Sequence, residues 1–214
     1  MKAKSLLIAG AALAASLMTS KAQVYSQNIV GYINVPLNAG YNLVANQLDL
    51  DGTGTNNTLL TVLSTNLPNK STVSAWNGAG FTTATYSSSG GWLGITPQVT
   101  AAMQPGSGFF LKVSAATNIT LVGNVIVGTN TYPILAGYNI VSPSAPVAGT
   151  IDTTNGFTPN NKDSISVWNG SGFNTYTFSS TGGWLPSDPQ IPVGSAVFLN
   201  SKANTNWTEV LNVQ

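Results

Sequence analysis

The sequence contains an internal duplication, and this feature constrains the fold more than any other. The run Ala39-Gly40-Tyr41-Asn42 recurs as Ala136-Gly137-Tyr138-Asn139, and Trp76-Asn77-Gly78 recurs as Trp168-Asn169-Gly170. The offset between the copies is 97 residues in the first pair and 92 residues in the second pair. Loops change length more readily than strands, so the falling offset predicts two copies of one architecture joined by shortened loops.

The first 22 residues have the composition of a secretory signal peptide. Lys2 and Lys4 form a basic start, an apolar stretch occupies residues 6–18, and small residues flank the expected cleavage point in Ser20-Lys21-Ala22. A membrane-spanning helix needs about 20 apolar residues, and this stretch is shorter. We therefore expect cleavage after Ala22, export through the general secretory pathway, and a soluble mature chain with no integral membrane segment.

Charge and cysteine content exclude several classes of partner and stabilising device. The chain has seven lysines, no arginine, six acidic residues and no cysteine. Three of the lysines lie in the expected signal peptide, so the mature chain is slightly acidic. Without arginine it lacks bidentate contacts to phosphate and guanine, and nucleic acid is not an expected partner. Without disulfides, an exported chain must depend on a packed core, which units of about 95 residues can form.

Short β-branched runs bounded by Gly and Pro indicate strands throughout the mature chain. We predict an all-β fold of two tandem homologous β-sandwich or barrel-like modules, module A at residues 23–123 and module B at 124–214. No Pro/Ser-rich linker separates them, so we expect them to be closely docked. One pseudo-symmetric domain of the same length is the alternative. One short helix is expected near residues 58–64, where Leu59 and Leu63 lie four positions apart.

Two predicted hairpins carry the candidate ligand-binding residues. Asn77-Gly78 and Asn169-Gly170 each lie between strand-like runs, which is typical of a type I′ turn. Successive strand residues point to opposite faces, so one face of these hairpins should enter the core: Val73, Ala75, Ala84 and Tyr86 in module A, and Ile165, Val167, Tyr176 and Phe178 in module B. The opposite face is rich in Ser and Thr and carries four hairpin rings, Trp76, Phe81, Trp168 and Phe173.

The hairpin rings have two interpretations. An exposed, coplanar set of rings among hydroxyl groups would suit the apolar face of a sugar. Alternatively, the rings stabilise the hairpin by cross-strand packing or lie beneath the loops that contain Gly91-Trp92 and Gly183-Trp184, which we expect to fold back over an open sheet edge. Exposure of the rings distinguishes the two interpretations.

Catalytic and metal chemistry is restricted to carboxylates. The chain has no histidine and no cysteine, which excludes Ser-His-Asp and Cys-His nucleophiles and ordinary zinc sites. A glycosidase needs two carboxylates placed around the scissile bond, and the six mature acids are scattered without counterparts in the other copy. We do not expect an enzyme. Asp49 and Asp51 precede Gly52 as in the start of a calcium loop, but the further ligands are missing. A solvated turn is the main interpretation, and Ca²⁺ is the one cofactor that these residues suggest.

Several segments together resemble a known group of proteins. They are Val24-Tyr25-Ser26-Gln27-Asn28-Ile29-Val30-Gly31-Tyr32-Ile33-Asn34-Val35, Ala39-Gly40-Tyr41-Asn42-Leu43-Val44-Ala45-Asn46, Trp76-Asn77-Gly78, Gly91-Trp92 and Pro105-Gly106-Ser107-Gly108-Phe109-Phe110. The chain resembles duplicated, signal-bearing secreted all-β proteins of Verrucomicrobiota and related bacteria over essentially its whole mature length. The resemblance implies export from a Gram-negative cell and implies no activity or catalytic residue. Module B departs from the pattern at Gly194-Ser195-Ala196-Val197-Phe198, which lacks the second Gly and the first Phe of module A.

These observations predict a non-catalytic exported β-protein with a structural or adhesive role at or outside the cell surface, or in the periplasm. The alternative is a glycan-binding protein that uses the hairpin rings, with extracellular polysaccharide or other surface proteins as partners. A glycoside hydrolase is the third possibility, and the scattered acids do not favour it.

Overall fold

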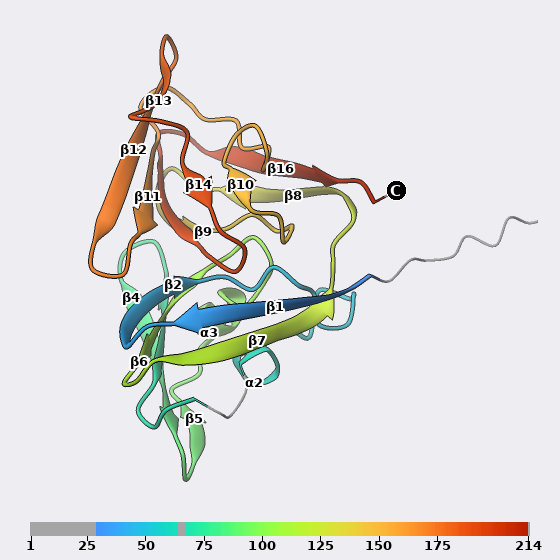
Figure 1. The fold of residues 1–214 in the computed structure, drawn as a ribbon, viewed down its shortest axis with the longest axis vertical. Coiled ribbons are helices and arrows are strands. Elements are labelled where there is room, and N and C mark those ends of the chain that lie inside the picture. Colours follow the sequence, from blue (N-terminus) through green and yellow to red (C-terminus); the bar gives the residue numbers. More distant parts are fainter. Residues whose placement is uncertain (1–28, 64–66, 214) are drawn as a thin grey trace, which may run out of the picture.

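The computed structural model describes residues 29–63 and 67–213. It consists of two β modules stacked along the long axis, with module B above module A in Figure 1. The predicted all-β fold is confirmed. The predicted signal peptide, residues 1–22, lies outside the described residues. Within the described residues, no helix has the length and apolar character needed to cross a membrane.

In its described residues, module A is built from seven strands and two short helices. Five antiparallel strands form a sheet in the order β2-β6-β3-β4-β5, and β1 pairs with β7 in a separate ribbon. The elements are β1 (Val30–Leu37), β2 (Gly40–Val44), α2 (Leu59–Val62), β3 (Thr72–Trp76), β4 (Phe81–Ser87), β5 (Gly91–Leu93), α3 (Pro97–Ala101), β6 (Phe109–Val113) and β7 (Thr117–Asn124).

Module B repeats this topology. Its five-stranded sheet has the order β13-β12-β11-β15-β9, and β16 pairs with β8. A two-stranded pair of β10 and β14 lies in the connections that hold α2 and α3 in module A. The elements are β8 (Gly128–Ile134), β9 (Gly137–Val141), β10 (Gly149–Thr150), β11 (Ser164–Trp168), β12 (Phe173–Ser179), β13 (Gly183–Leu185), β14 (Gln190–Ile191), β15 (Val197–Ser201) and β16 (Thr205–Leu211).

The described residues contain three apolar clusters. One fills module A and includes Val73, Phe109 and Leu111. A second fills module B and includes Ile165 and Trp207. The third contains residues of both modules and lies between them. Each module therefore has a core of its own, and the predicted core faces of β3, β4, β11 and β12 are buried or half-buried as expected.

Two expectations about local structure are corrected. The Gly-Gly-Trp segments are not loops that cover an edge, because they form the edge strands β5 and β13. Their tryptophans are buried and pack on the core-facing rings opposite them, Trp92 on Tyr86 and Trp184 on Phe178. The β-type sequence of residues 118–128 predicts one continuous strand, but the structure interrupts it, since β7 ends at Asn124 and β8 begins at Gly128.

The short helix predicted near residues 58–64 is present as α2, whereas α3 was not predicted. Helix α3 begins with Pro97, and the Thr96 hydroxyl accepts a hydrogen bond from the Val99 amide at 3.4 Å. Proline at the first helical position and threonine as the N-cap both favour a helix start. With five residues, the helix is too short to show a clear apolar period in the sequence.

Candidate functional site

The hairpin turns place the candidate rings at the ends of paired strands. Trp76 lies opposite Phe81, and Trp168 lies opposite Phe173. The turn is not the predicted type I′ with Asn and Gly at its centre, because only Gly78 has a positive φ, +95°. Asn77 instead precedes the central residues, and its Oδ1 accepts hydrogen bonds from the amides of Ala79 and Gly80 at 3.0 and 2.8 Å. The asparagine therefore stabilises the turn through its side chain.

Strand register defines the outer face of the module A sheet, which is the face opposite the core. Cross-strand pairs set out three rows of side chains on this face. The first row contains Tyr41, Lys112, Thr72 and Thr85; the second contains Leu43, Phe110, Ser74 and Thr83; the third contains Trp76 and Phe81. In the first two rows the hydroxyl residues therefore lie together on β3 and β4, beside the aromatic rings of β2 and β6.

The two modules meet through aromatic rings on their outer faces. These eight residues, here called the aromatic seam, are Tyr41, Trp76, Phe81 and Phe110 of module A and their repeat counterparts Tyr138, Trp168, Phe173 and Phe198 of module B. Phe110 makes edge contact with Trp168 at 5.8 Å between centroids, and Trp76 makes edge contact with Phe198 at 6.2 Å. Edge-to-face geometry is favourable for aromatic pairs, so the seam holds the modules together.

Each hairpin tryptophan also donates a hydrogen bond to the other module. The Nε1 of Trp76 donates to the Tyr138 carbonyl at 2.7 Å, and the Nε1 of Trp168 donates to the Tyr41 carbonyl at 2.9 Å. The two bonds are related by the repeat, so the modules exchange equivalent contacts.

Backbone hydrogen bonds and hydrogen bonds of the Gln47 side chain complete the junction between the modules. The Ala45 amide donates to the Gly194 carbonyl at 3.0 Å, and the equivalent bond from Ser142 to Gly106 is 3.1 Å long. Gln47 is fully buried, and its side-chain Nε2 donates to the carbonyls of Pro143 and Ala145. Its Oε1 accepts a hydrogen bond from the Gly194 amide. These bonds agree with the predicted close docking of the modules.

The hairpin rings show the cross-strand packing that was one interpretation of the sequence, because the ring centroids of Trp76 and Phe81 lie 5.1 Å apart and those of Trp168 and Phe173 lie 5.0 Å apart. Phe81 and Phe173 are 48% and 42% exposed, while Trp76 and Trp168 are half-buried at the seam. Each tryptophan is inclined to its partner phenylalanine, by 62° in module A and 68° in module B, so the rings are not coplanar. The Gly-Gly-Trp segments do not cover them, because Trp92 and Trp184 pack in the cores. Sequence periodicity correctly identified the sheet face that carries the hairpin rings. It did not reveal that the other module packs against this face.

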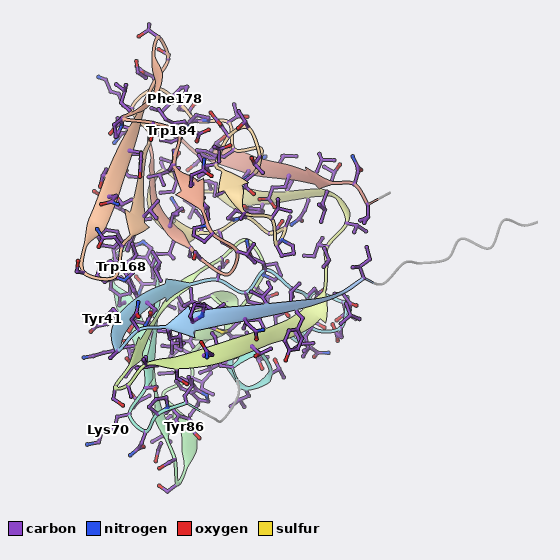
Figure 2. The ribbon with its side chains drawn as sticks, in the orientation of Figure 1. Tyr41, Lys70, Tyr86, Trp168, Phe178 and Trp184 are labelled. Atoms are coloured by element: carbon purple, nitrogen blue, oxygen red, sulfur yellow. The ribbon has the colours of Figure 1, made fainter. Side chains whose placement is uncertain are left out.

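A groove opens where the outer face of module A passes beneath the hairpin of module B. Its volume is about 400 Å³, and its lining consists of Tyr41, Ser74, Phe81, Thr83, Phe110 and Trp168. We call it the seam groove. Figure 2 shows Tyr41 and Trp168 at the junction of the modules, far from Phe178 and Trp184. Two of the four hairpin rings, Phe81 and Trp168, therefore come together in one concave site, together with two hydroxyl groups and two further rings.

The seam groove has one charged neighbour on its own sheet face. The Lys112 ammonium lies 5.0 Å from the centroid of the Tyr41 ring, within the range of a cation–π interaction. Neither Tyr41 nor Phe110 was identified as a site residue from the sequence. The repeat contained a usable signal, because aromatic residues occupy both positions in both copies.

The two predicted calcium ligands are engaged in hydrogen bonds within their own loop. Asp49 is buried and accepts from the Asn57 side chain and the Gly54 amide, each at 2.9 Å. Asp51 accepts from the Thr53 hydroxyl and amide, and these bonds, together with one from Asn56, lower the pKa of its carboxyl. The part of the chain that the structure describes holds no group of three or more acidic, His or Cys side chains suited to a metal ion. Calcium binding at Asp49 and Asp51 stays a prediction.

Module B contains buried carboxyl groups that sequence reasoning did not single out. Glu209 is 5% exposed; its Oε2 accepts from the amides of Ser144 and Ala145, while its Oε1 has no partner among the described residues. Burial is the main cause that raises the pKa of Glu209. The repeat contained a signal for this residue, because module A has the apolar Leu121 at the position where module B has the acidic Glu209.

A second perturbed carboxyl lies beside another acid. Burial, followed by the hydrogen bond and charge of Asp152, raises the pKa of Asp188 to about 7. Two neighbouring carboxyl groups cannot both ionise without repulsion. The Asp188 carboxyl therefore holds its proton to a higher pH than an isolated aspartate does.

Comparisons with protein-family models, with curated proteins and with solved structures found no match.

Proposed function

We propose that this chain is a non-catalytic, exported adhesive protein that binds extracellular polysaccharide in the seam groove. The observation that carries the proposal is the lining of the groove, in which Tyr41, Phe81 and Phe110 lie beside the hydroxyl groups of Ser74 and Thr83. Aromatic faces pack against the apolar C–H surface of a sugar ring, while hydroxyl groups can donate to and accept from its edges.

Exposure of the rings supports binding of an external ligand. Phe81 and Tyr41 are each 48% exposed although they belong to an otherwise packed cluster. Large exposed apolar side chains that gather in a concave surface are typical of interaction sites. Both rings therefore present part of their surface to solvent although they belong to the aromatic seam.

The carboxyl groups support a non-catalytic role. A retaining glycosidase holds its two carboxyl groups about 5–5.5 Å apart around the sugar bond. Asp152 and Asp188 lie close enough for Asp152 to raise the pKa of Asp188. Neither residue lines the seam groove.

Fluorescence titration tests the proposal. Because Trp168 lines the groove, we expect a polysaccharide ligand to change tryptophan emission and the change to saturate. Phe81→Ala should abolish or greatly weaken the response. Tyr138→Ala is the control, since it removes an exposed seam ring of module B that does not line the groove. No response of the unaltered protein to any polysaccharide would reject the proposal.

A purely structural role is the second candidate, and the reciprocal tryptophan hydrogen bonds favour it. In that case the aromatic seam serves only to join the modules. Phe81→Ala would then alter stability without any polysaccharide ligand being found. Measuring the unfolding midpoint and the titration on the same samples separates the two functions.

A further inference from the structure

Lys112 lies on the same sheet face as the seam groove and close to its lining. Strand register places it directly between Tyr41 of β2 and Thr72 of β3. Phe110, which lines the groove, is two residues away on the same strand and points to the same face. Residues two apart on a strand are separated by about 7 Å, so the flexible lysine side chain can reach a ligand held over Phe110.

The lysine is the only charged residue in the rows of the outer face that strand register defines. Its cross-strand neighbours are Tyr41 and Thr72, and Thr85 lies beyond Thr72 in the same row. The next row contains Leu43, Phe110, Ser74 and Thr83. Lys112 is exposed, and its ammonium rests over the Tyr41 ring rather than beside a carboxylate of these rows. A positive charge is thus held next to an aromatic, hydroxyl-lined groove without an acidic partner on that face.

The repeat provides an internal comparison. The position of Lys112 opposite Tyr41 corresponds to Asn200 opposite Tyr138 in module B. Module B therefore keeps the aromatic and hydroxyl residues of the face but not the charge. The charge occurs in the copy whose face supplies most of the groove lining.

We propose that the seam groove binds an anionic polysaccharide, with a carboxylate or sulfate group of the sugar paired with Lys112. This inference rests on the proposed function and specifies its substrate class. A sugar ring would contact Phe81 and Phe110, and its acidic substituent would lie towards Tyr41 and Lys112. An ammonium is a compact point charge that can pair with a carboxylate or with a sulfate. Experiment must therefore distinguish carboxylated from sulfated polysaccharides.

The test compares three purified polymers: polygalacturonate, which carries carboxylates; dextran sulfate, which carries sulfates; and neutral dextran. Kd is measured by tryptophan fluorescence at low and at high salt for the full chain. We expect at least one anionic polymer to bind more tightly than dextran, and added salt to weaken that binding because exposed charges are screened.

Lys112→Asn introduces the residue that module B carries at this position. We expect it to weaken binding of the anionic polymer about two- to five-fold at low salt, the range that one exposed ion pair allows. Lys70→Asn is the matched control, because it removes the same charge elsewhere. Lys70 has φ +66°, a conformation that asparagine tolerates well, so the control should remain folded.

The outcomes are distinguishable. If dextran binds as tightly as both anionic polymers, or if Lys112→Asn and Lys70→Asn reduce binding equally, the anionic specificity is wrong while glycan binding stands. If no polymer binds, the proposed function itself fails and this inference fails with it. The anionic polymer whose affinity Lys112→Asn lowers identifies the acidic group.

Discussion

A Cβ atom placed on Gly108 would lie 2.2 Å from the Cβ of Ala196. Gly108 and Ala196 are equivalent residues of the two copies, and they contact each other across the junction of the modules. Real Cβ atoms do not approach so closely, and there is space for one methyl group only. This explains why module B can carry alanine in Gly194-Ser195-Ala196 while module A keeps glycine in Gly106-Ser107-Gly108.

Gly108→Ala should therefore destabilise the protein by about 1–3 kcal/mol, the usual cost of overpacking. The double variant Gly108→Ala with Ala196→Gly should recover part of this loss, because it removes the contact with the Ala196 methyl group while the contact with Ile140 Cγ2 at 3.0 Å remains. Urea unfolding midpoints measure both effects. Equal stability of the single and the double variant would show that the contact does not control packing here.

Trp76→Phe and Trp168→Phe should each cost about 1 kcal/mol beyond the loss of ring volume, because each removes a hydrogen bond between modules. Trp92→Phe is the matched control. The Trp92 indole is buried, and its Nε1 has no hydrogen-bond partner in the part of the chain that the structure describes. Chemical unfolding of the three variants tests this order, and a larger loss for Trp92→Phe than for both seam variants would contradict it.

Glu209→Gln should raise the melting temperature at pH 7–8 by about 2–4 °C, which corresponds to about 1 kcal/mol for a chain of this size. Burial raises the pKa of Glu209 above its ordinary value of 4.5. Stability from this group is therefore fully present below about pH 4.5 and is lost as pH rises through the folded-state pKa. Melting temperatures measured at acidic and neutral pH should converge for the variant. A variant that melts lower than the parent at pH 8 would argue against an unfavourable buried charge.

Asp188→Asn should remove a second pH-dependent loss of stability. The pKa of Asp188 rises from 3.8 to about 7 in the folded protein, so its contribution is present below about pH 4 and is lost as pH passes through about 7. Thermal unfolding between pH 5 and 9 should show a smaller decline for the variant. Combining Asp188→Asn with Glu209→Gln separates the two carboxyl groups, since they should act independently.

Much of the fold could be predicted because its signals are local. Alternation along β3 and β4 distinguished Val73 and Ala75, which are buried, from Ser74 and Trp76 on the outer face. Strand pairing with an Asn-Gly signal located the hairpins. The turn type was wrong because the Asn77 side chain itself accepts the turn amides, which a dipeptide pattern does not reveal.

The site could be predicted only in part. Phe81 and Trp168 were identified as candidates, but their meeting depends on how one module docks on the other. Tyr41, Phe110 and Lys112 come from strands distant in sequence, and only pairing between β2, β3 and β6 brings them to one face. Periodicity specifies which face of a strand is apolar and leaves open which surface will cover it.

The reciprocal hydrogen bonds of Trp76 and Trp168 have a consequence for the origin of the duplication. Each copy offers an indole donor and a carbonyl acceptor at the same sites, so one copy alone would be complementary to a second identical chain. A single-copy ancestor with this surface would have assembled as a symmetric homodimer, and tandem fusion then turned its subunit interface into an intramolecular one. Such an ancestor needed glycine in both subunits at the position now held by Gly108 and Ala196, and fusion permitted one of them to change.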